Sequence, residues 1–485
     1  MFSTIPSIPS FRPAFNIGGM LDIPTGNYHI GVNGESILNS GLFPIVSLAG
    51  PGNSFKSAIT SFFNLTVAEH IDQYKLAIYD SECSSQYDRI NQLAARFPKL
   101  SQIKHGSDYI EDADIRIKLT SSAEMLGDVY FDAIMKIAAE KRKSKKPLLD
   151  TPFLTPKGLT ISILPPTGVM IDSLSEFKVT ANEENIVEKN KIGDSGNNIL
   201  YMRQGIAKKQ LITQLPNMCV SCGMYFTMTA HVGDAFDIGG KFAPKLHTLT
   251  HSKKGSKITG TTKAFEFINN ALYEIFNVSL LNNPENKTGV LYPVIESDRD
   301  KDCTDLLKIH LKLTRNKSGP SGASVDLIIS QREGVLPHLS QFHYIKEINR
   351  FGLVGNNTSY ALSLVPDVKL SRTTVRRIID DSAEVQRGLE ITSELLQIKT
   401  LWATLPDGLM CTPDELYADL KALGYDWSVL LNTRGYWVFT ESDKDNLPYL
   451  STLDLLKMRK GLYKAYFLND DNKTYKPKVL HSLNT

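Results

Sequence analysis

The stretch "GPGNSFKSAI", residues 50–59, constrains the fold more than any other part of this chain. It nearly matches the phosphate-binding pattern G-x-x-x-x-G-K-[ST], which requires a buried strand before the loop and a helix after it. Residues 42–49 form an apolar run of strand length, and residues 57–71 carry apolar side chains at helical spacing. The sequence therefore predicts a strand, a tight loop and a helix, with the helix N-terminus available to a phosphate.

Within this loop, Phe55 stands where the pattern has its second glycine. A larger residue fits there if its φ is negative and its ring points away from the ligand. Lys56 is expected to reach the outer phosphates of ATP, and Ser57 to ligate Mg²⁺. A plain turn between a strand and a helix is the alternative. The expected nucleotide-binding residues of the loop are Gly50, Pro51, Gly52, Asn53, Ser54, Phe55, Lys56 and Ser57.

Two further apolar runs end in acidic residues. In "YKLAIYDSE" the last residue, Glu82, could orient and deprotonate the water that attacks a γ-phosphate. In "GVMIDSLSEF" the acid is Asp172, which would hold Mg²⁺-bound water or the hydroxyl of Ser57. Functional groups collect at the carboxyl ends of strands in a doubly wound sheet. Lys56, Glu82 and Asp172, in this order, therefore predict an α/β nucleoside triphosphatase.

Bulk properties exclude some classes of protein. At 485 residues the chain is too long for one typical domain, and its net charge of +2 limits any nucleic-acid surface to a local patch. Neither a signal peptide nor an apolar run of about 18 residues is evident, so we expect a soluble intracellular protein without a membrane partner. The cysteines are expected to be small buried residues in a reduced compartment. They are Cys83, Cys219, Cys222, Cys303 and Cys411.

The order of these motifs resembles the RecA-type recombinases, most closely the phage UvsX-type branch. That branch is similar at "GPxxSFKS", which accommodates Phe55, and at "YDSE". Downstream, "KIGDSGNNILYMRQGIAKKQL" resembles the first DNA-binding loop and the helix after it. "GMYFTMTAHVGD" resembles a strand that ends in a sensor of the γ-phosphate, a role that His231 or Thr229 would hold. The resemblance implies a RecA-like core over residues 29–355, with an insertion near residues 140–165.

The resemblance also implies residues that complete the nucleotide site. "KLTRNKSGPSGASVDLIISQREGV" resembles the basic element of the family and its following hairpin strand, so Arg315 and Lys317 are assigned to the γ-phosphate of a neighbouring subunit. Tyr87 is expected to stack on the adenine, with a half-buried structural aromatic as the alternative. Two departures from RecA are Thr261 with Thr262, in place of two glycines, and Glu266, in place of a lysine.

DNA is expected to bind two loops. The first spans about residues 179–198, and the second spans residues 234–262, a length that is rare without a functional reason. "SKITGTTKAFEFINNALYEI" resembles the end of the second loop and the strand after it. Most contacts should be made to phosphate, so binding should depend little on base sequence. A solvated loop is the alternative. The expected DNA-binding residues are Arg203, Lys208, Lys241, Lys245, Lys253, Lys254 and Lys257, with Lys209 beside them.

The two ends of the chain suggest contacts with partners. Residues 1–28 are expected to form an arm whose "FRPA", residues 11–14, resembles a peptide that docks on the next subunit. Residues 356–485 are expected to form a small α+β domain with a helix over 373–402. Residues 412–442 are expected to form a helix, a turn and a hairpin, compatible with a winged-helix-like unit. The basic last segment could bind duplex DNA, and a helical cap on the core is the alternative.

Together these features favour an ATP-dependent DNA recombinase. It would form filaments on single-stranded DNA and promote homologous pairing and strand exchange, using ATP and Mg²⁺. The resemblance implies a role in phage recombination, repair or replication in the cytoplasm of an infected bacterial host, with a loader or single-strand-binding protein as a further expected partner. A hexameric replicative helicase of RecA fold and a RecA-like DNA-binding paralogue with little ATPase activity are the alternatives.

Overall fold

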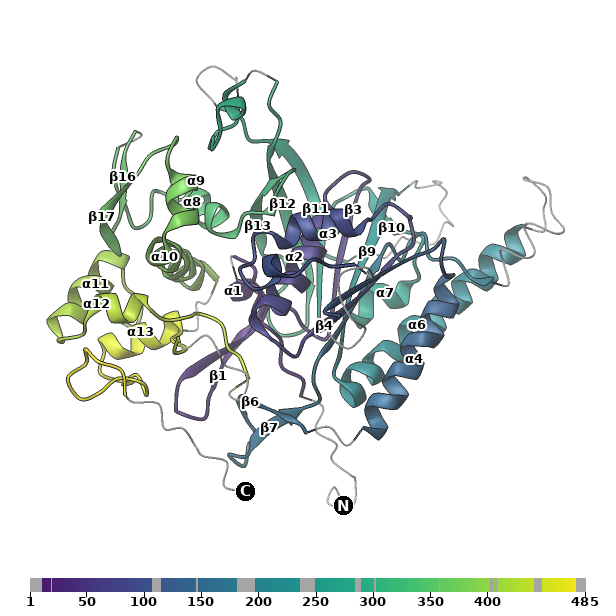
Figure 1. Ribbon diagram of the computed structural model, residues 1–485, viewed down its shortest axis with the longest axis horizontal. Helices are drawn as coiled ribbons and strands as arrows, with labels where there is room; N and C mark the ends of the chain where they lie inside the picture. Colours follow the sequence, from purple (N-terminus) through teal and green to yellow (C-terminus); the bar gives the residue numbers. More distant parts are fainter. Residues whose placement is uncertain are drawn as a thin grey trace, which may run out of the picture.

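The computed structural model describes most of the chain. The described residues are 11–18, 20–106, 115–144, 147–180, 197–235, 249–283, 289–300, 302–356, 358–401, 405, 408–439 and 447–476, without the side chains of 197–201. Over these residues the molecule is an α/β protein with one large, mostly parallel sheet between helices (Figure 1). The coarse fold class expected from the sequence is therefore confirmed.

Ten described strands form the central sheet, in the order β14-β13-β12-β11-β3-β9-β8-β4-β5, with β10 paired to β9. The strands from β11 to β5 in this order run parallel, and β10, β12, β13 and β14 pair antiparallel. Their bounds are β3 Ile45–Gly50, β4 Lys75–Asp80, β5 Ile117–Ser121, β8 Thr167–Asp172, β9 Met224–Asp234, β10 Ser256–Thr259, β11 Ala271–Leu280, β12 Leu306–Asn316, β13 Ser324–Ser330 and β14 Gly334–Val335. The predicted strands before the loop, before Glu82 and at Asp172 are all present.

Side chains alternate between the two faces of the sheet along each strand, so both faces carry apolar residues. Helices cover both faces. On β3, Val46 and Leu48 join the core beneath α2, whereas Ile45 and Ala49 join the core beneath α4 and α6. Figure 1 shows α4 and α6 side by side at one end of the molecule. The helices around the sheet are α2 Lys56–His70, α3 Tyr87–Ala94, η2 Leu100–Gln102, α4 Gly127–Lys143, α6 Asn197–Cys222 and α7 Lys263–Ile268.

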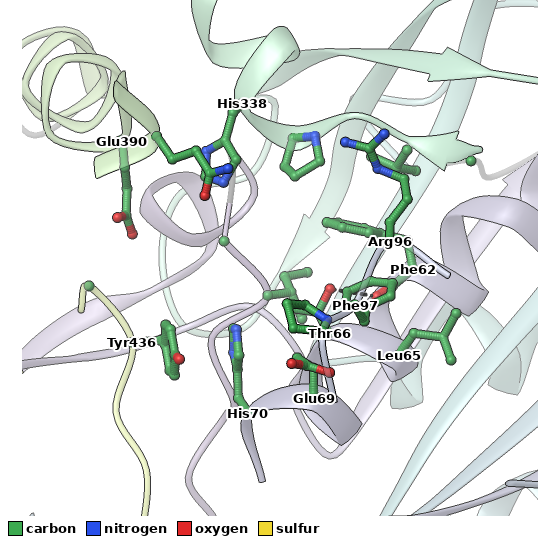
Figure 2. Close-up of a pocket in the computed structure, with 18 of the residues that line it drawn as sticks. Phe62, Leu65, Thr66, Glu69, His70, Arg96, Phe97, His338, Glu390 and Tyr436 are labelled. Atoms are coloured by element: carbon green, nitrogen blue, oxygen red, sulfur yellow. Dashed lines mark hydrogen bonds between the residues drawn. The ribbon is translucent and has the colours of Figure 1, made fainter. Parts of the chain in front are cut away.

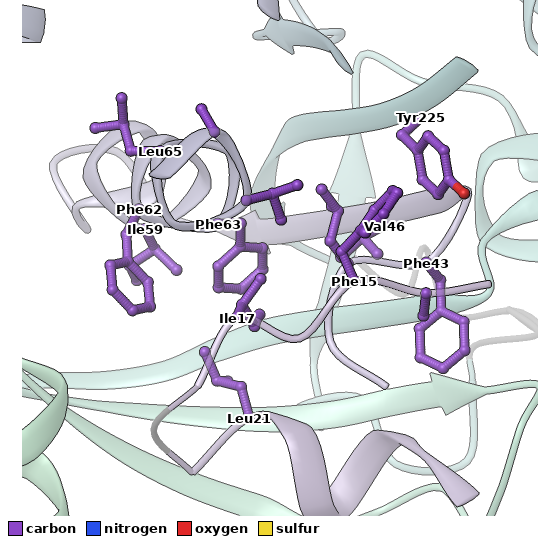
Figure 3. Close-up of a cluster of buried hydrophobic side chains, with 14 of the residues drawn as sticks. Phe15, Ile17, Leu21, Phe43, Val46, Ile59, Phe62, Phe63, Leu65 and Tyr225 are labelled. Carbon is purple, nitrogen blue, oxygen red and sulfur yellow. The ribbon is translucent and has the colours of Figure 1, made fainter. Parts of the chain in front are cut away.

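The described part of the amino-terminal arm packs on its own chain. Figure 3 shows Phe15, Ile17 and Leu21 beside the side chains of α2. The Ala14 carbonyl accepts a hydrogen bond from Trp437 Nε1 at 2.9 Å, and the ring of Phe15 stacks on Trp437 at 5.1 Å. Phe11 packs against His29 and Phe153. The "FRPA" segment, expected to dock on a neighbouring subunit, is therefore engaged within the same chain in this structure.

Two small sheets lie beside the main one. The first pairs β1 Asn27–Ile30 with β2 Ser36–Asn39, after the short helix α1 Asp22–Thr25. The expected insertion forms the second, a hairpin of β6 Leu149–Leu154 and β7 Thr160–Ile163. A single bridge between Gly31 and Phe153 joins the two small sheets. The insertion thus lies outside the central sheet.

The carboxyl-terminal region is mainly helical and shares its core with the preceding part of the chain. One buried cluster joins Tyr292, Ile328 and Phe342 to Leu389 and Leu455. The domain boundary expected near residue 355 therefore falls inside one continuous hydrophobic core. The elements are η3 Glu296–Arg299, α8 Pro337–Glu347, β15 Leu353–Gly355, β16 Tyr360–Leu362, β17 Val365–Leu370, α9 Val375–Asp381, α10 Ala383–Leu401, α11 Pro413–Ala422, α12 Trp427–Leu431 and α13 Thr452–Arg459.

The hairpin predicted after α11 is not formed. Residues 427–431 form α12, and residues 432–439 are described without any strand. Trp437 and Phe439 instead fill the core beside Phe15, which explains their apolar character. The helix predicted over 373–402 is present as α9 and α10, broken at Ser382. Among the described helices, none combines the length and the apolar character needed to cross a bilayer.

Candidate nucleotide site

A cavity of about 370 Å³ opens at the carboxyl ends of β3, β4 and β8. It is lined by the loop 52–57, by Glu82 after β4, by Asp172 at the end of β8 and by His231 on β9. Three of the groups predicted to act on a nucleotide, Lys56, Glu82 and Asp172, therefore face one space. Parallel strands bring their carboxyl ends to the same edge of the sheet, which explains why these three side chains lie close together.

The loop before α2 has a glycine-like backbone at residues that are not glycine. The φ angles of Asn53 and Phe55 are 53° and 63°, in the left-handed region. The expected negative φ at Phe55 is therefore wrong; Phe55 packs against the core beneath α2 and also lines the cavity. At Gly50, an added Cβ would lie 2.8 Å from Ser54 Oγ and 3.1 Å from Ile275, so the loop passes too closely for a side chain there.

Lys56 is held over this loop by backbone carbonyls. Its Nζ donates to the carbonyl oxygens of Gly50 at 3.2 Å and Pro51 at 2.7 Å. Burial lowers the pKa of Lys56, and the carboxylates of Asp172 and Glu82 oppose this shift. A cation held this way at the start of a helix can exchange its carbonyl partners for phosphate oxygens.

Asp172 lies beneath the loop and is almost fully buried. The hydroxyl of Thr229 donates to its Oδ1 at 2.5 Å, and Ser57 also hydrogen-bonds to it. Burial raises the pKa of Asp172, while these two hydrogen bonds lower it. Ser57 and Asp172 are thus joined as a metal-water site would require. Thr229 is fully buried below them, so of the two candidate sensors only His231 lines the cavity.

Glu82 and His231 form a pair at the mouth of the cavity. His231 Nε2 lies 3.0 Å from Glu82 Oε1, and both side chains are partly exposed. The turn that carries Glu82 is held by Asp80, which accepts hydrogen bonds from the backbone N–H groups of Glu82, Ser84 and Ser85. Asp80 is a functional residue not predicted from the sequence, although an aspartate followed by serines is typical of such a turn.

Tyr87 does not line the cavity. Its hydroxyl accepts a hydrogen bond from the Leu119 N–H on β5 at 3.0 Å, and its ring packs on the core. Gln86 and Arg89, from the same end of α3, face the cavity instead. This arrangement matches the alternative for Tyr87, a half-buried structural aromatic, and the adenine contact stays a prediction. Arg89, whose pKa burial lowers, is an α3 side chain that offers a planar group to the cavity.

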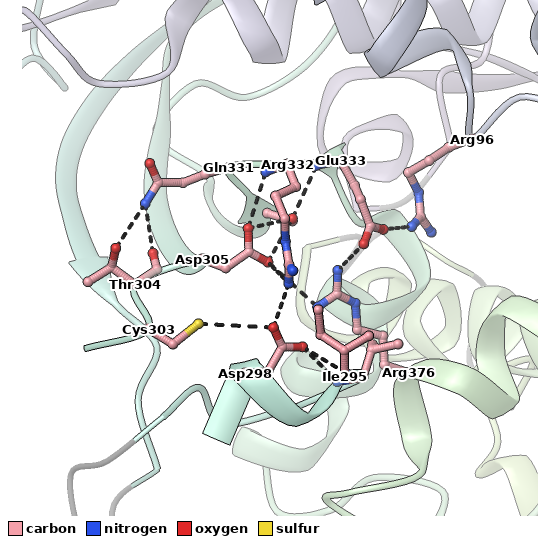
Figure 4. A network of polar contacts seen from close by, with 12 residues as sticks. Arg96, Ile295, Asp298, Cys303, Thr304, Asp305, Gln331, Arg332, Glu333 and Arg376 are labelled. Carbon is pink, nitrogen blue, oxygen red and sulfur yellow. Dashed lines mark hydrogen bonds and ion pairs between the residues drawn. The ribbon is translucent and has the colours of Figure 1, made fainter. Parts of the chain in front are cut away.

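A network of ion pairs extends from α3 toward the carboxyl-terminal helices (Figure 4). Arg89 donates to the Arg332 carbonyl, and the Arg332 guanidinium binds Asp298 and Asp305. Glu333 joins the network to α9 and to the residues after α3. It binds Arg376 at 2.6 Å and also pairs with Arg96. The α3 wall of the cavity is thus fixed by charges from three parts of the chain.

Arg315 and Lys317 lie away from this cavity and bind the end of α7. Arg315 donates to the carbonyls of Phe267 and Asn269, and Lys317 donates to that of Ile268 at 2.9 Å. Cations at a helix carboxyl terminus are stabilised by the exposed carbonyls. Within one chain these two residues do not reach the loop at Lys56, so their expected role requires a neighbouring subunit.

The residues expected to bind DNA divide into three groups. Arg203 and Lys209 on α6, and Lys253, Lys254 and Lys257 around β10, are exposed. Lys241, Lys245 and residues 181–196 lie outside the described residues. Lys208 is buried, with only 3% of its surface exposed, and burial lowers its pKa to about 8. Its assignment as a DNA contact is therefore wrong, because its ammonium cannot reach a phosphate.

The second expected loop is partly a strand. Residues 256–259 form β10, which pairs with residues 231–234 of β9. The Glu274 carboxylate accepts hydrogen bonds from the Lys253 N–H and the Ser256 hydroxyl. The described lysines of this loop therefore lie just before β10 (Lys253 and Lys254) and on it (Lys257).

The cysteines match the expectation in part. Cys219, Cys222 and Cys411 are buried, Cys303 is partly buried and Cys83 is exposed. Cys83 lies in the turn directly after Glu82, with a φ of 53°. Within the described residues no cluster of three or more His, Cys, Asp or Glu side chains is arranged as a metal cage.

A larger cavity, about 670 Å³, lies elsewhere, between α2, α10 and residues 433–436 (Figure 2). Its charged groups are already paired: Arg96 with Asp380, and Arg387 with Glu390. The His70 and Tyr436 rings stack at 3.5 Å on one wall. None of the described groups expected to bind phosphate faces this space; those of the loop 52–57 line the smaller cavity.

No model of a known protein family matches this chain, and a comparison with curated proteins also gives no match.

Proposed function

We propose that this chain is an ATP-dependent DNA recombinase of the RecA type, which forms filaments on single-stranded DNA and promotes strand exchange. The observation that carries the proposal is the meeting of Lys56, Ser57, Glu82 and Asp172 around one cavity. Phosphoryl transfer needs a cation for the developing charge, a metal site and a group that orients water. These four side chains are of the types that supply those functions, and the strand ends hold them without a partner chain.

ATP fits the loop by its donors. The N–H groups at the start of α2 and the ammonium of Lys56 would hold the phosphates, and the Ser57 hydroxyl with Asp172 would hold Mg²⁺, which neutralises phosphate charge. Lys56 would then leave the Gly50 and Pro51 carbonyls that it binds now. Glu82 is the group that takes a proton from the attacking water, and His231 is its hydrogen-bond partner.

DNA binding and assembly are supported by position. Exposed Lys253 and Lys254 lie just before β10 and exposed Lys257 lies on it, and the end of β10 pairs with His231 of β9. Their charges would release counterions from a phosphate backbone. Arg315 and Lys317 would supply cations to the nucleotide of the next subunit, which would make filament assembly depend on ATP. Duplex DNA binding through the carboxyl-terminal region has weaker support, because Arg459 and Lys464 already bind Asp419 and Asp470.

The test is ATP hydrolysis with and without single-stranded DNA, with negative-stain electron microscopy of the same samples. Lys56→Ala should abolish hydrolysis, and Lys75→Ala, an exposed lysine at the other end of β4, is the matched control. DNA-stimulated hydrolysis with open helical filaments supports the recombinase. Closed rings would favour the hexameric helicase. Wild-type hydrolysis no higher than that of Lys56→Ala would favour a DNA-binding paralogue with little ATPase activity.

A further inference from the structure

Lys208 is a buried cation that binds two backbone segments at once. Its Nζ donates to the carbonyl oxygens of Ser175 and Gly260, each at 2.8 Å. Its neighbour Lys209 is exposed on the same helix. A buried ammonium is costly unless its hydrogen bonds are satisfied. The side chain therefore fixes α6 to the turn after β8 and to the end of β10.

Ser175 is the residue at which these segments meet. Its hydroxyl donates to the Thr259 carbonyl at 2.8 Å and accepts a hydrogen bond from the His231 N–H at 2.9 Å. Ser175 follows closely after Asp172 at the end of β8. We refer to Ser175, Lys208, His231, Thr259 and Gly260 as the Ser175 junction.

The contact between β10 and Ser175 leaves no free space. Gly260 has a φ of +66°, and a Cβ there would lie 2.8 Å from the Ser175 carbonyl oxygen and 2.9 Å from its Cα and Cβ. Nearby Gly255 also has a positive φ, but its added Cβ would meet nothing within 4 Å. A displacement of the end of β10 must therefore move Ser175 or break the contact, because closely packed interiors are poorly compressible.

We propose that Lys208 is a positioning residue that couples DNA binding to the Glu82–His231 pair through the Ser175 junction. This inference rests on the proposed function. Exposed Arg203 and Lys209 lie on α6, and exposed Lys253, Lys254 and Lys257 lie directly before and on β10. DNA bound to these cations acts on Lys208 or Gly260, then on Ser175, and so on the backbone of His231.

The geometry requires the effect to run in both directions. The His231 ring faces Glu82 at 3.0 Å, while its backbone N–H binds the Ser175 hydroxyl. A nucleotide that changes the Glu82–His231 pair therefore acts on the same junction. By linkage, if DNA strengthens nucleotide binding, the nucleotide strengthens DNA binding by the same factor.

The experiment compares Lys208→Met with Lys209→Met in the full chain. We measure ATP hydrolysis without DNA and at saturating single-stranded DNA, together with DNA affinity at several salt concentrations. Lys208→Met should keep its DNA-free rate within about twofold, while the stimulation by DNA falls at least about fivefold, a typical size for coupling between sites. Lys209→Met should keep its stimulation and lose about one unit of salt slope in DNA binding.

Retention of full stimulation by Lys208→Met overturns the proposal. So does an equal loss of the DNA-free and stimulated rates, because a purely structural role would lower both. If Lys208→Met does not fold, Ser175→Ala takes its place, since it removes only the hydroxyl that joins His231 to Thr259. Absence of DNA-stimulated hydrolysis in the wild type overturns the proposed function itself, so the two failures are distinguishable.

Discussion

At the scale of single residues, the loop before α2 stores strain where a ligand would bind. Asn53 and Phe55 both have left-handed backbones, which cost a residue with a Cβ roughly 1 kcal/mol or more. The Phe55 ring offsets this cost by packing on the core beneath α2. At Phe55 the loop therefore keeps the backbone conformation that the pattern's glycine would adopt, although the residue is not glycine.

Replacement of Phe55 should reverse the usual order of alanine and glycine. Both variants lose the packing of the ring, but only Phe55→Gly relieves the positive φ of 63°. We expect Phe55→Gly to be more stable than Phe55→Ala by about 1 kcal/mol, measured by urea unfolding. Phe62→Ala against Phe62→Gly, within α2, is the control pair and should show the ordinary order. A more stable Phe55→Ala would contradict a left-handed residue at this position.

A buried acid on α10 should make stability depend on pH. Burial raises the pKa of Glu394 to about 8, with the Glu390 charge adding to the shift and Arg387 opposing it. Because the folded pKa is raised, the stabilisation is complete below the ordinary pKa near 4.5 and is lost as the pH rises through about 8. The Thr452 hydroxyl donates to this carboxyl at 2.5 Å.

Glu394→Gln keeps an acceptor for Thr452 but cannot ionise. Its Tm should therefore fall less than that of the wild type between about pH 5 and about pH 8. Burial raises the pKa of Asp22 to about 7, so part of the dependence should remain in the variant. Equal falls in thermal unfolding experiments would show that Glu394 does not titrate in this window.

The site residues can be predicted from the sequence where a motif specifies them. They are harder to predict where the direction of the side chain decides its role. Lys56, Glu82 and Asp172 were found from their positions after apolar runs. Tyr87 has a ring suited to adenine, but a helix turns about 100° per residue, and Arg89 faces the cavity. Lys208 could have been recognised as buried, because it precedes Leu211, Ile212 and Leu215 at the spacing of one helical face.

At the scale of elements, the strands of the parallel core were predictable because they are apolar along their length. β10 was not, since its four residues, "SKIT", have little strand character of their own. The pairing of β3 with β9 ends at Gly50 and His231, and β10 pairs with the continuation of β9 beyond that point. The hairpin predicted after α11 failed for a related reason. Its aromatic residues fill a distant core, and no local pairing uses them.

The lysines just before and on β10 should carry much of the phosphate contact. Replacing Lys253, Lys254 and Lys257 together with glutamine should reduce the salt slope of single-stranded DNA binding by up to about two units. Fluorescence anisotropy at a series of salt concentrations measures this slope. Gln substitution of Lys308, Lys312 and Lys346, on β12 and α8, is the control and should leave the slope unchanged. An unchanged slope in the β10 variant would place the DNA elsewhere.

At the scale of the whole molecule, the carboxyl-terminal helices complete the core. Phe342 and Ile345 of α8 are fully buried in a cluster that includes Leu389 of α10 and Leu455 of α13. A chain that ends at residue 355 should therefore expose the apolar face of α8. We expect it to aggregate or to bind a hydrophobic dye, where the full chain does not. A soluble, cooperatively unfolding fragment 1–355 would show that the core closes without these helices.

The packing of Trp437 on the amino-terminal arm has a consequence for synthesis on the ribosome. Phe15 and Ala14 receive this partner only after about 420 further residues have been translated. At about 5–20 residues per second, the arm waits roughly 20–80 seconds for this partner, whereas α2, Tyr74 and Tyr225, which also pack on it, are translated earlier. The part of the core around Phe15 is therefore completed only late in translation, when Trp437 joins it.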